Sequence, residues 1–173
     1  IFFQFFKFAM IPPTNGEFLK LKKYKGMTDS QNDALDFLKS KLDDSISSIN
    51  VYDALNRHTD EYIYFRTDHH WTALGAYYAY ASFMEKTGRQ PVALESYEQI
   101  DIGDFLGSSY KKTLNDSLKK NPDHIIAYKP FTGYEYLMYN SGKEKKADII
   151  DMKYANKITD KSLAFMSSGG ANW

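Results

Sequence analysis

The chain has 173 residues, enough for one domain with its own core and too few for two full domains. Its 22 lysine and arginine residues balance 22 aspartate and glutamate residues, so we expect no nucleic-acid partner, which would favour a basic face. The absence of cysteine excludes disulfides, thiolate metal sites and a cysteine nucleophile.

The first eleven residues are mostly apolar, but they do not have the pattern of a membrane span. A spanning helix needs about 20 apolar residues, and this run contains Gln4 and Lys7 before it ends at Pro12-Pro13. It also lacks the basic leader and the cleavage site of a signal peptide. Because the chain begins without methionine, we interpret it as a piece of a longer protein with any export or anchor segment elsewhere.

The residues before the central motif alternate between strand-like and helix-like segments. Residues 7–11 predict a buried strand, and Ser30 with Asp33 resembles a capping box, which predicts a helix from there to about Leu42. Residues 46–52 and 62–65 are two further strand candidates. The order of strand, helix and strand indicates an α/β sheet.

A second helix is predicted after the motif, because Leu74, Tyr77, Tyr78 and Ala81 recur at helical spacing before Gly88 and Pro91. The pattern then changes to a loop at 104–110, strands at 125–128, 134–139 and 147–152, and turns between them, with the charged run 143–146 in a solvated turn. We therefore expect residues 1–91 to form an α/β part and residues 92–173 a loop and β-meander region, inserted in the same domain.

The segment Asp68-His69-His70-Trp71-Thr72 lies between a predicted strand and a predicted helix, where sites of open α/β sheets collect. An aspartate two residues before a histidine can fold back onto the imidazole, fix its tautomer and stabilise its charged form. The other ring nitrogen then takes a proton from a hydroxyl nucleophile. Asp68 and His70 are thus predicted to be hydrogen-bonded, directly or through one water, as the acid–base half of a Ser-His-Asp site.

Three neighbours of this pair have their own expected placements. The side chain of His69 should point away from its neighbours, because side chains alternate along an extended chain. Trp71 should pack beneath the pair rather than touch a substrate. Tyrosines near the site are candidates for lining a sugar groove, since the ring is apolar and the hydroxyl stays hydrated, although tyrosine also fills strands and half-buried faces.

Two other readings of the motif remain open. Asp68 or Thr67 would cap the following helix if the motif were structural, with His70 and Trp71 packed under the sheet. A metal site would combine Asp68, His69 and His70 with a further histidine, His58 or His124. Adjacent histidines rarely reach one ion, and no usual zinc spacing is present, so we predict no metal and no cofactor. His58 and His124 are interpreted as exposed loop residues.

The string from Thr67 to Thr72, followed by Gly75-Ala76-Tyr77-Tyr78, resembles the signature of the DHHW family of bacterial proteins. The resemblance extends over most of the chain, with weaker matches at 9–12, 51–55, 104–107 and 160–172. That family is similar to the periplasmic alginate O-acetyltransferases. The resemblance implies part of an SGNH-hydrolase-like three-layer α/β domain with a β-rich insertion. It implies O-acetyl transfer or removal on an exported polysaccharide, with His70 as base and Asp68 as its orienter.

In those relatives the nucleophilic serine follows a later strand, in a setting such as Gly-Asp-Ser. Here Asn115-Asp116-Ser117 follows no such strand, and Ser167 and Ser168 lie in a glycine-rich loop. We therefore expect the nucleophile to lie outside this chain. The alternative is that Ser167 or Ser168 is the nucleophile. The expected partners are a carbohydrate polymer and a membrane-bound acyltransferase that supplies acetyl groups. The expected location is extracytoplasmic. The competing hypotheses are a non-catalytic glycan-binding or cell-envelope assembly protein, and a structural domain.

Overall fold

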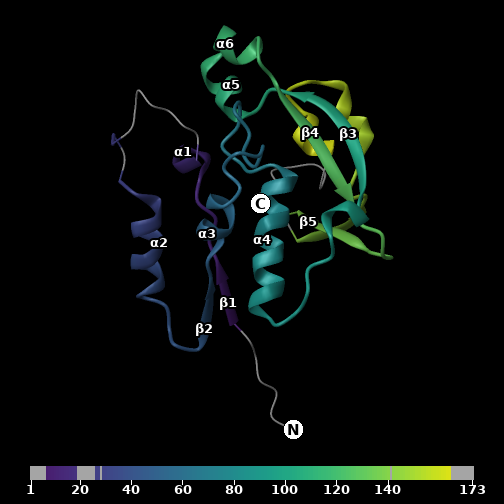
Figure 1. Ribbon diagram of the computed structural model, residues 1–173. Helices are drawn as coiled ribbons and strands as arrows, with labels where there is room; N and C mark the ends of the chain where they lie inside the picture. Colours follow the sequence, from purple (N-terminus) through teal and green to yellow (C-terminus); the bar gives the residue numbers. More distant parts are fainter. Residues whose placement is uncertain (1–6, 19–25, 28, 141, 165–173) are drawn as a thin grey trace.

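The computed structural model describes residues 7–18, 26–27, 29–140 and 142–164 (Figure 1). Within these ranges helices and strands are mixed, which confirms the expected α/β class. The strands form three separate pairs: β1 with β2, β3 with β4, and β5 with β6. Of the helices in these ranges, none has the length and the apolar composition that a membrane-spanning helix needs.

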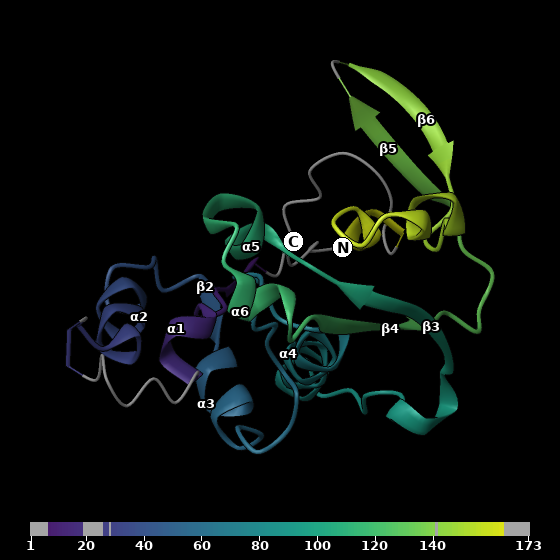
Figure 2. The same cartoon turned by 90° about the horizontal axis from the view of Figure 1, so that it is seen from above.

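The first half is built around a parallel pair of strands, β1 (Lys7–Met10) and β2 (Ile46–Ile49). Helix α2 (Gln31–Lys39) lies on one side of this pair and α4 (Ala73–Lys86) on the other, as Figures 1 and 2 both show. Short helices α1 (Asn15–Phe18) and α3 (Val51–Asn56) complete this half. Its core contains aliphatic and aromatic side chains from β2, α3, α4 and the segment before the motif: Ile49, Val51, Leu55, Ile63, Tyr64 and Ala79.

Two strand predictions of this half need correction. The strand predicted at 46–52 ends at Ile49, because the side chain of Asn50 accepts a hydrogen bond from the Asp53 N–H (3.0 Å) and starts α3. The strand predicted at 7–11 exists as β1, but its end residues Lys7 and Met10 are exposed rather than buried.

Both predicted helices of this half exist. Helix α2 carries the expected Ser30 cap on the Asp33 N–H (3.3 Å), although it ends at Lys39 rather than near Leu42. Helix α4 runs from Ala73 to Lys86, in the place where the apolar spacing predicts it.

The strand predicted at 62–65 is wrong. The chain instead folds back on itself: the Phe65 N–H donates to the His70 carbonyl (3.2 Å), and the Thr72 N–H donates to the Ile63 carbonyl (2.9 Å). A single bridge joins Tyr64 to Trp71. The backbone hydrogen bonds of these residues are made with the motif itself. The motif is therefore the tip of a short hairpin-like loop and not the end of a sheet strand.

The second half consists of two antiparallel pairs. Strands β3 (Glu98–Phe105) and β4 (Asp123–Lys129) are joined through α5 (Ser108–Thr113) and α6 (Asp116–Lys119). Strands β5 (Tyr136–Asn140) and β6 (Lys143–Ala147) form a hairpin that projects from the body in Figure 2. Short 3-10 helices η2 (Leu94–Ser96), η3 (Met152–Asn156) and η4 (Lys161–Ala164) connect or flank them. Ile102, Phe105, Ile125, Ala127 and Ala164 form a second core.

Three expectations for this half are wrong. The loop predicted at 104–110 contains the end of β3 and the first half of α5, the strand predicted at 147–152 is not formed, and the solvated turn predicted at 143–146 is strand β6. Strand β6 is charged and almost fully exposed. Its sequence therefore lacks the alternation of apolar and polar residues by which a strand is predicted. The strands at 125–128 and 134–139 correspond to β4 and, shifted by two residues at its start, to β5.

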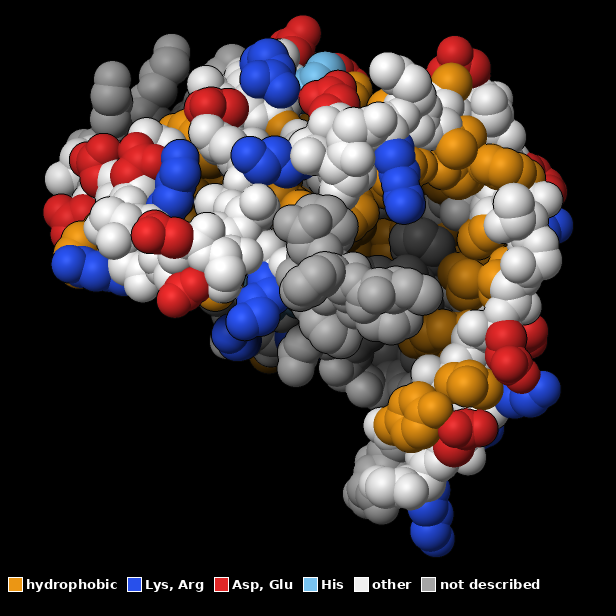
Figure 3. Space-filling view, turned by 90° about the horizontal axis from the view of Figure 1, so that it is seen from below, with side chains coloured by type: hydrophobic (Ala, Val, Ile, Leu, Met, Phe, Trp, Pro, Cys, Tyr) orange, Lys and Arg blue, Asp and Glu red, His pale blue; other side chains and the backbone are white. Residues whose placement is uncertain are grey.

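Aromatic side chains gather on this half. Tyr77 of α4 lies against Tyr97, with ring centroids 6.4 Å apart, and Tyr97 lies against Tyr128 of β4 and Phe131. Figure 3 shows hydrophobic side chains along the side of the molecule that carries the projecting hairpin. The large exposed hydrophobic residues near that hairpin are Phe131, Tyr134 and Tyr139.

Candidate functional site

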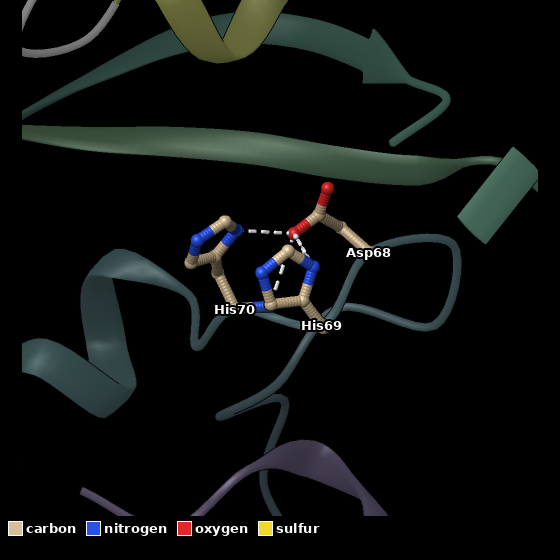
Figure 4. Close-up of side chains that lie close together, drawn as sticks. All are labelled: Asp68, His69 and His70. Carbon is tan, nitrogen blue, oxygen red and sulfur yellow. Dashed lines mark hydrogen bonds and ion pairs between the residues drawn. The ribbon is translucent and has the colours of Figure 1, made fainter. Parts of the chain in front are cut away.

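The loop between Phe65 and Thr72 presents Asp68, His69 and His70 beside strands β3 and β4 (Figure 4). Asp68 is buried, with 6% of the residue exposed. The His70 side chain is 33% exposed and that of His69 is 56% exposed. The site therefore has one buried carboxylate with two imidazoles between it and solvent.

The predicted pairing of Asp68 with His70 is confirmed. His70 Nδ1 lies 2.5 Å from Asp68 Oδ1, and the His70 backbone N–H donates to the same oxygen at 3.0 Å. With Nδ1 facing the carboxylate, Nε2 is the nitrogen left to exchange a proton, and Figure 4 shows the second ring nitrogen turned away from Asp68. This is the histidine orientation that a general base needs when a carboxylate supports it.

The second carboxylate oxygen of Asp68 accepts a hydrogen bond from the Ser108 backbone N–H, at 2.7 Å. Burial alone would raise the pKa of Asp68, but the hydrogen bonds from the His70 side chain and from Ser108 and His70 N–H outweigh it and hold this pKa below its ordinary value. Asp68 is thus ionised at neutral pH and faces His70 as a carboxylate.

The expected placement of His69 is wrong. Its Nδ1 lies 2.8 Å from Ser108 Oγ and 3.7 Å from Asp68 Oδ1, and its ring centroid is 3.9 Å from that of His70. Alternation of side chains holds for an extended chain, whereas this segment bends continuously from Arg66 to His70. Both imidazoles therefore lie on the same side of the loop as the carboxylate.

The helix-cap reading does not account for the following helix. Helix α4 is capped by Thr72, whose hydroxyl oxygen accepts from the Gly75 N–H (3.3 Å) and donates to the Tyr62 carbonyl (2.7 Å). Besides the His70 N–H, Asp68 accepts from the N–H of Ser108, the first residue of α5. Asp68 therefore joins the motif loop to a segment 40 residues later, in addition to its contact with His70.

A metal site is the remaining alternative, since ligand atoms of Asp68, His69 and His70 all lie within 4.8 Å of one another. Asp68 Oδ1 and His70 Nδ1 lie 2.5 Å apart, which is the separation of a short hydrogen bond. The two further histidines lie elsewhere: His58 bonds Glu61 (2.6 Å), and His124 lies between Asp101 and Asp104. Neither is brought to the motif.

Other residues singled out from the sequence fall in several places. Trp71 is half-buried against the first core, as expected. Ser117 is an exposed residue of α6. Ser167 and Ser168 lie outside the residues that the structure describes. The hydroxyls of Tyr62 and Tyr64 donate hydrogen bonds to Asp123 and to the Pro13 carbonyl, so both side chains support the loop.

Sequence reasoning missed the residues that hold the loop. Thr67 is fully buried, and its hydroxyl accepts from the Gly107 N–H at 2.9 Å. Asn15 donates to the Asp68 carbonyl at 2.8 Å. Gly107 and Ser108, at the start of α5, are the kind of helix-start signal that would mark one of these contacts, but no sequence pattern links them to Asp68.

The comparisons with known proteins place the chain in a family. The family model described as DHHW protein matches residues 8–172. The crystal structure of a DHHW family protein from Eubacterium siraeum is similar with a TM-score of 0.82 and 31% identity, over 93% of this chain and 54% of that chain. No match was found among curated proteins.

Two structures of PatB1 from Bacillus cereus are also similar, each with a TM-score of 0.73. One has 19% identity over 95% of this chain and 60% of that chain. The other, which carries a sulfonyl adduct, has 17% identity over 94% of this chain and 57% of that chain. The chain thus shares a fold with these proteins while spanning between 54% and 60% of their length.

Proposed function

This chain belongs to the DHHW protein family, and from that premise we propose that it supplies the acid–base half of a Ser-His-Asp site for O-acetyl transfer or hydrolysis. The observation that carries the proposal is the Asp68–His70 pair, with Nδ1 of the imidazole 2.5 Å from a buried carboxylate. In this proposal His70 is the general base and Asp68 orients it and stabilises its charged form.

The reaction proceeds in two half-steps. A serine hydroxyl attacks the acetyl carbonyl carbon while His70 Nε2 takes the hydroxyl proton; the carbon–oxygen bond to the donor breaks, and His70 returns the proton to the departing oxygen. A hydroxyl of the acceptor, or water, then attacks the acetyl-serine with His70 again as base, and serine regains its proton. Asp68 stays ionised throughout, because its pKa lies below the ordinary range.

We propose that the nucleophilic serine lies outside these 173 residues. The chain spans only 54–60% of the similar structures, which leaves room for the missing group in a longer protein. PatB1 of Bacillus cereus is described with a sulfonyl adduct, and a sulfonyl group is the kind of electrophile that an activated nucleophile attacks. The proposed whole is an SGNH-hydrolase-like three-layer domain, with residues 1–91 as part of it and residues 92–173 as its β-rich insertion.

The proposed substrate is an exported bacterial polysaccharide, which places the protein outside the cytoplasm, with a membrane-bound acyltransferase as the source of acetyl groups. The support for this step is the resemblance of the family to the periplasmic alginate O-acetyltransferases. Exposed aromatic side chains near the β5–β6 hairpin suit sugar rings, because an aromatic face packs on the apolar face of a sugar.

A sulfonyl fluoride and 4-nitrophenyl acetate test the chemistry without knowledge of the glycan. We expect the full-length protein to gain one sulfonyl group by mass spectrometry and to release nitrophenol from the ester. His70→Ala should lose both reactions while remaining folded, and His58→Ala, a histidine remote from the site, should keep both. Equal labelling of the His70→Ala variant would leave a non-catalytic glycan-binding or assembly protein as the better reading.

A further inference from the structure

The carboxylate of Asp123 lies behind the motif loop and is not used by the proposed chemistry. Asp123 is the first residue of β4 and is fully buried. A buried carboxylate is costly unless its oxygens accept several hydrogen bonds. The hydrogen-bond donors around Asp123 therefore indicate its structural role.

Among the residues that the structure describes, the polar contacts of the Asp123 side-chain oxygens come from Tyr62, Arg66 and Thr67, shortly before Asp68. Oδ1 accepts from the Arg66 backbone N–H at 2.8 Å and from the Tyr62 hydroxyl, with Arg66 Nε at 3.4 Å. Oδ2 accepts from the Thr67 backbone N–H at 2.7 Å and from the Thr67 hydroxyl at 2.5 Å. One side chain thus fixes two consecutive backbone amides that precede the catalytic aspartate.

Thr67 also contacts the segment that bonds Asp68. Its hydroxyl accepts from the Gly107 N–H (2.9 Å), and its carbonyl accepts from the Ser109 N–H (2.9 Å). Between these two amides, the Ser108 N–H donates to Asp68 Oδ2. Hydrogen bonds therefore run in both directions between the two segments. Asp123 accepts from amides of the motif loop, and Asp68 accepts from an amide of the segment that leads from β3 toward β4.

We propose that Asp123 is a positioning residue of the site, which sets the Asp68–His70 geometry by holding the backbone of Arg66 and Thr67. The proposal rests on the proposed function for its catalytic consequence, but its geometric claim concerns only this chain. Misplacement of a catalytic group by about 1 Å costs up to about a hundredfold in rate. Loss of the Asp123 acceptor should therefore lower kcat far more than it changes KM.

The test follows the imidazole proton between His70 and Asp68 by NMR in the full-length protein. A proton held between an imidazole nitrogen and a carboxylate gives a strongly deshielded signal, which is assigned by its loss in His70→Gln. Asp123→Asn keeps the shape of the side chain but replaces one acceptor oxygen by a donor group. We expect it to lose or shift this signal and to lower kcat for 4-nitrophenyl acetate by about tenfold to a hundredfold, with KM nearly unchanged.

Two further variants keep the proposal testable if Asp123→Asn fails to fold. Thr67→Val removes the hydroxyl that links Asp123 to Gly107 and should alter the same signal, whereas Thr67→Ser restores the hydroxyl and should restore the signal. Asp104→Asn changes the neighbouring exposed carboxylate of β3, which contacts His124, and serves as the matched control with no change expected.

The outcomes separate this proposal from the proposed function. Folded Asp123→Asn or Thr67→Val protein with the wild-type imidazole signal would overturn the positioning role. An unaltered protein without esterase activity would count against the proposed function, while the signal would still decide the role of Asp123.

Discussion

Gly107 lies directly against Asp68. A Cβ atom at position 107 would stand 2.3 Å from Asp68 Cβ and 2.6 Å from its Oδ2, closer than two such atoms can approach. Because Ser108 N–H donates to that same oxygen, the backbone reaches the carboxylate only where there is no side chain at Gly107. The close approach explains how a segment so distant in sequence becomes part of the site.

We predict that Gly107→Ala displaces Asp68. The added methyl group overpacks a buried contact, which costs about 1–3 kcal/mol of unfolding free energy, and it should weaken the hydrogen bond to His70. Urea unfolding measures the loss. The matched control is Gly133→Ala, because a Cβ there meets no atom within 4 Å; equal stability of the two variants would contradict the account.

The ionised state of Asp68 should make the stability of the protein depend on pH. Its pKa in the folded protein lies below the ordinary value, so the unfolded chain takes up the proton first as the pH falls. The stabilisation is complete well above the ordinary aspartate pKa of about 3.9 and is lost as the pH falls through the folded pKa. Asp68→Asn should therefore lower the free energy of unfolding most at pH 7. The difference in this free energy between the variant and the wild type should narrow below about pH 4. A gap of constant size between pH 7 and pH 3 would contradict this prediction.

The hydroxyl of Thr72 should stabilise the junction between the motif and α4. It satisfies the Gly75 N–H and donates to the Tyr62 carbonyl, and Thr72 is buried. Thr72→Val keeps the shape but removes both contacts, with an expected cost of about 1–2 kcal/mol. Thr72→Ser keeps both contacts and should lose much less. Thermal unfolding of the two variants side by side distinguishes the cap from simple packing.

The Asp68–His70 pair was predictable because it is local. The two groups are two positions apart in the chain, and the chemistry of an aspartate beside a histidine determines which ring nitrogen is held. The start of α2 at Ser30 and the course of α4 were predictable for the same reason, since caps and helical spacing are read within a few residues.

The support for the pair was not predictable, because it comes from distant residues. Asp123 reaches Thr67 across 56 positions, and Ser108 reaches Asp68 across 40. No periodic pattern marks such contacts. The strand prediction at 62–65 failed for a related reason: its β-prone residues pair with the motif loop instead of a sheet, and tertiary context decides between the two.

The 173-residue chain should be inert by itself. If the nucleophile lies elsewhere, the chain holds a base and its orienter with no hydroxyl to activate. We expect no release of nitrophenol above the buffer rate and no mass gain with a sulfonyl fluoride. Labelling that disappears in Ser167→Ala or Ser168→Ala would instead place the nucleophile within the chain.

The metal alternative makes a separate prediction. If the pair shares a proton, prolonged dialysis against a chelator should leave the activity of the full-length protein unchanged, and elemental analysis should find no stoichiometric metal. Activity that is lost with the chelator and restored by zinc would mean that Asp68, His69 and His70 hold an ion.

The most direct measurement of the central claim is the activity of four full-length proteins: the wild type, His70→Ala, Asp68→Asn and His69→Ala. Loss of the base costs orders of magnitude in other Ser-His-Asp sites, so His70→Ala should abolish both 4-nitrophenyl acetate hydrolysis and acetylation of the cell's polysaccharide. Asp68→Asn should lose as much or somewhat less. His69→Ala should lose least, because His69 bonds the Ser108 hydroxyl and leaves the hydrogen bond between Asp68 and His70 in place. Normal hydrolysis and normal acetylation in a folded His70→Ala protein would contradict the account.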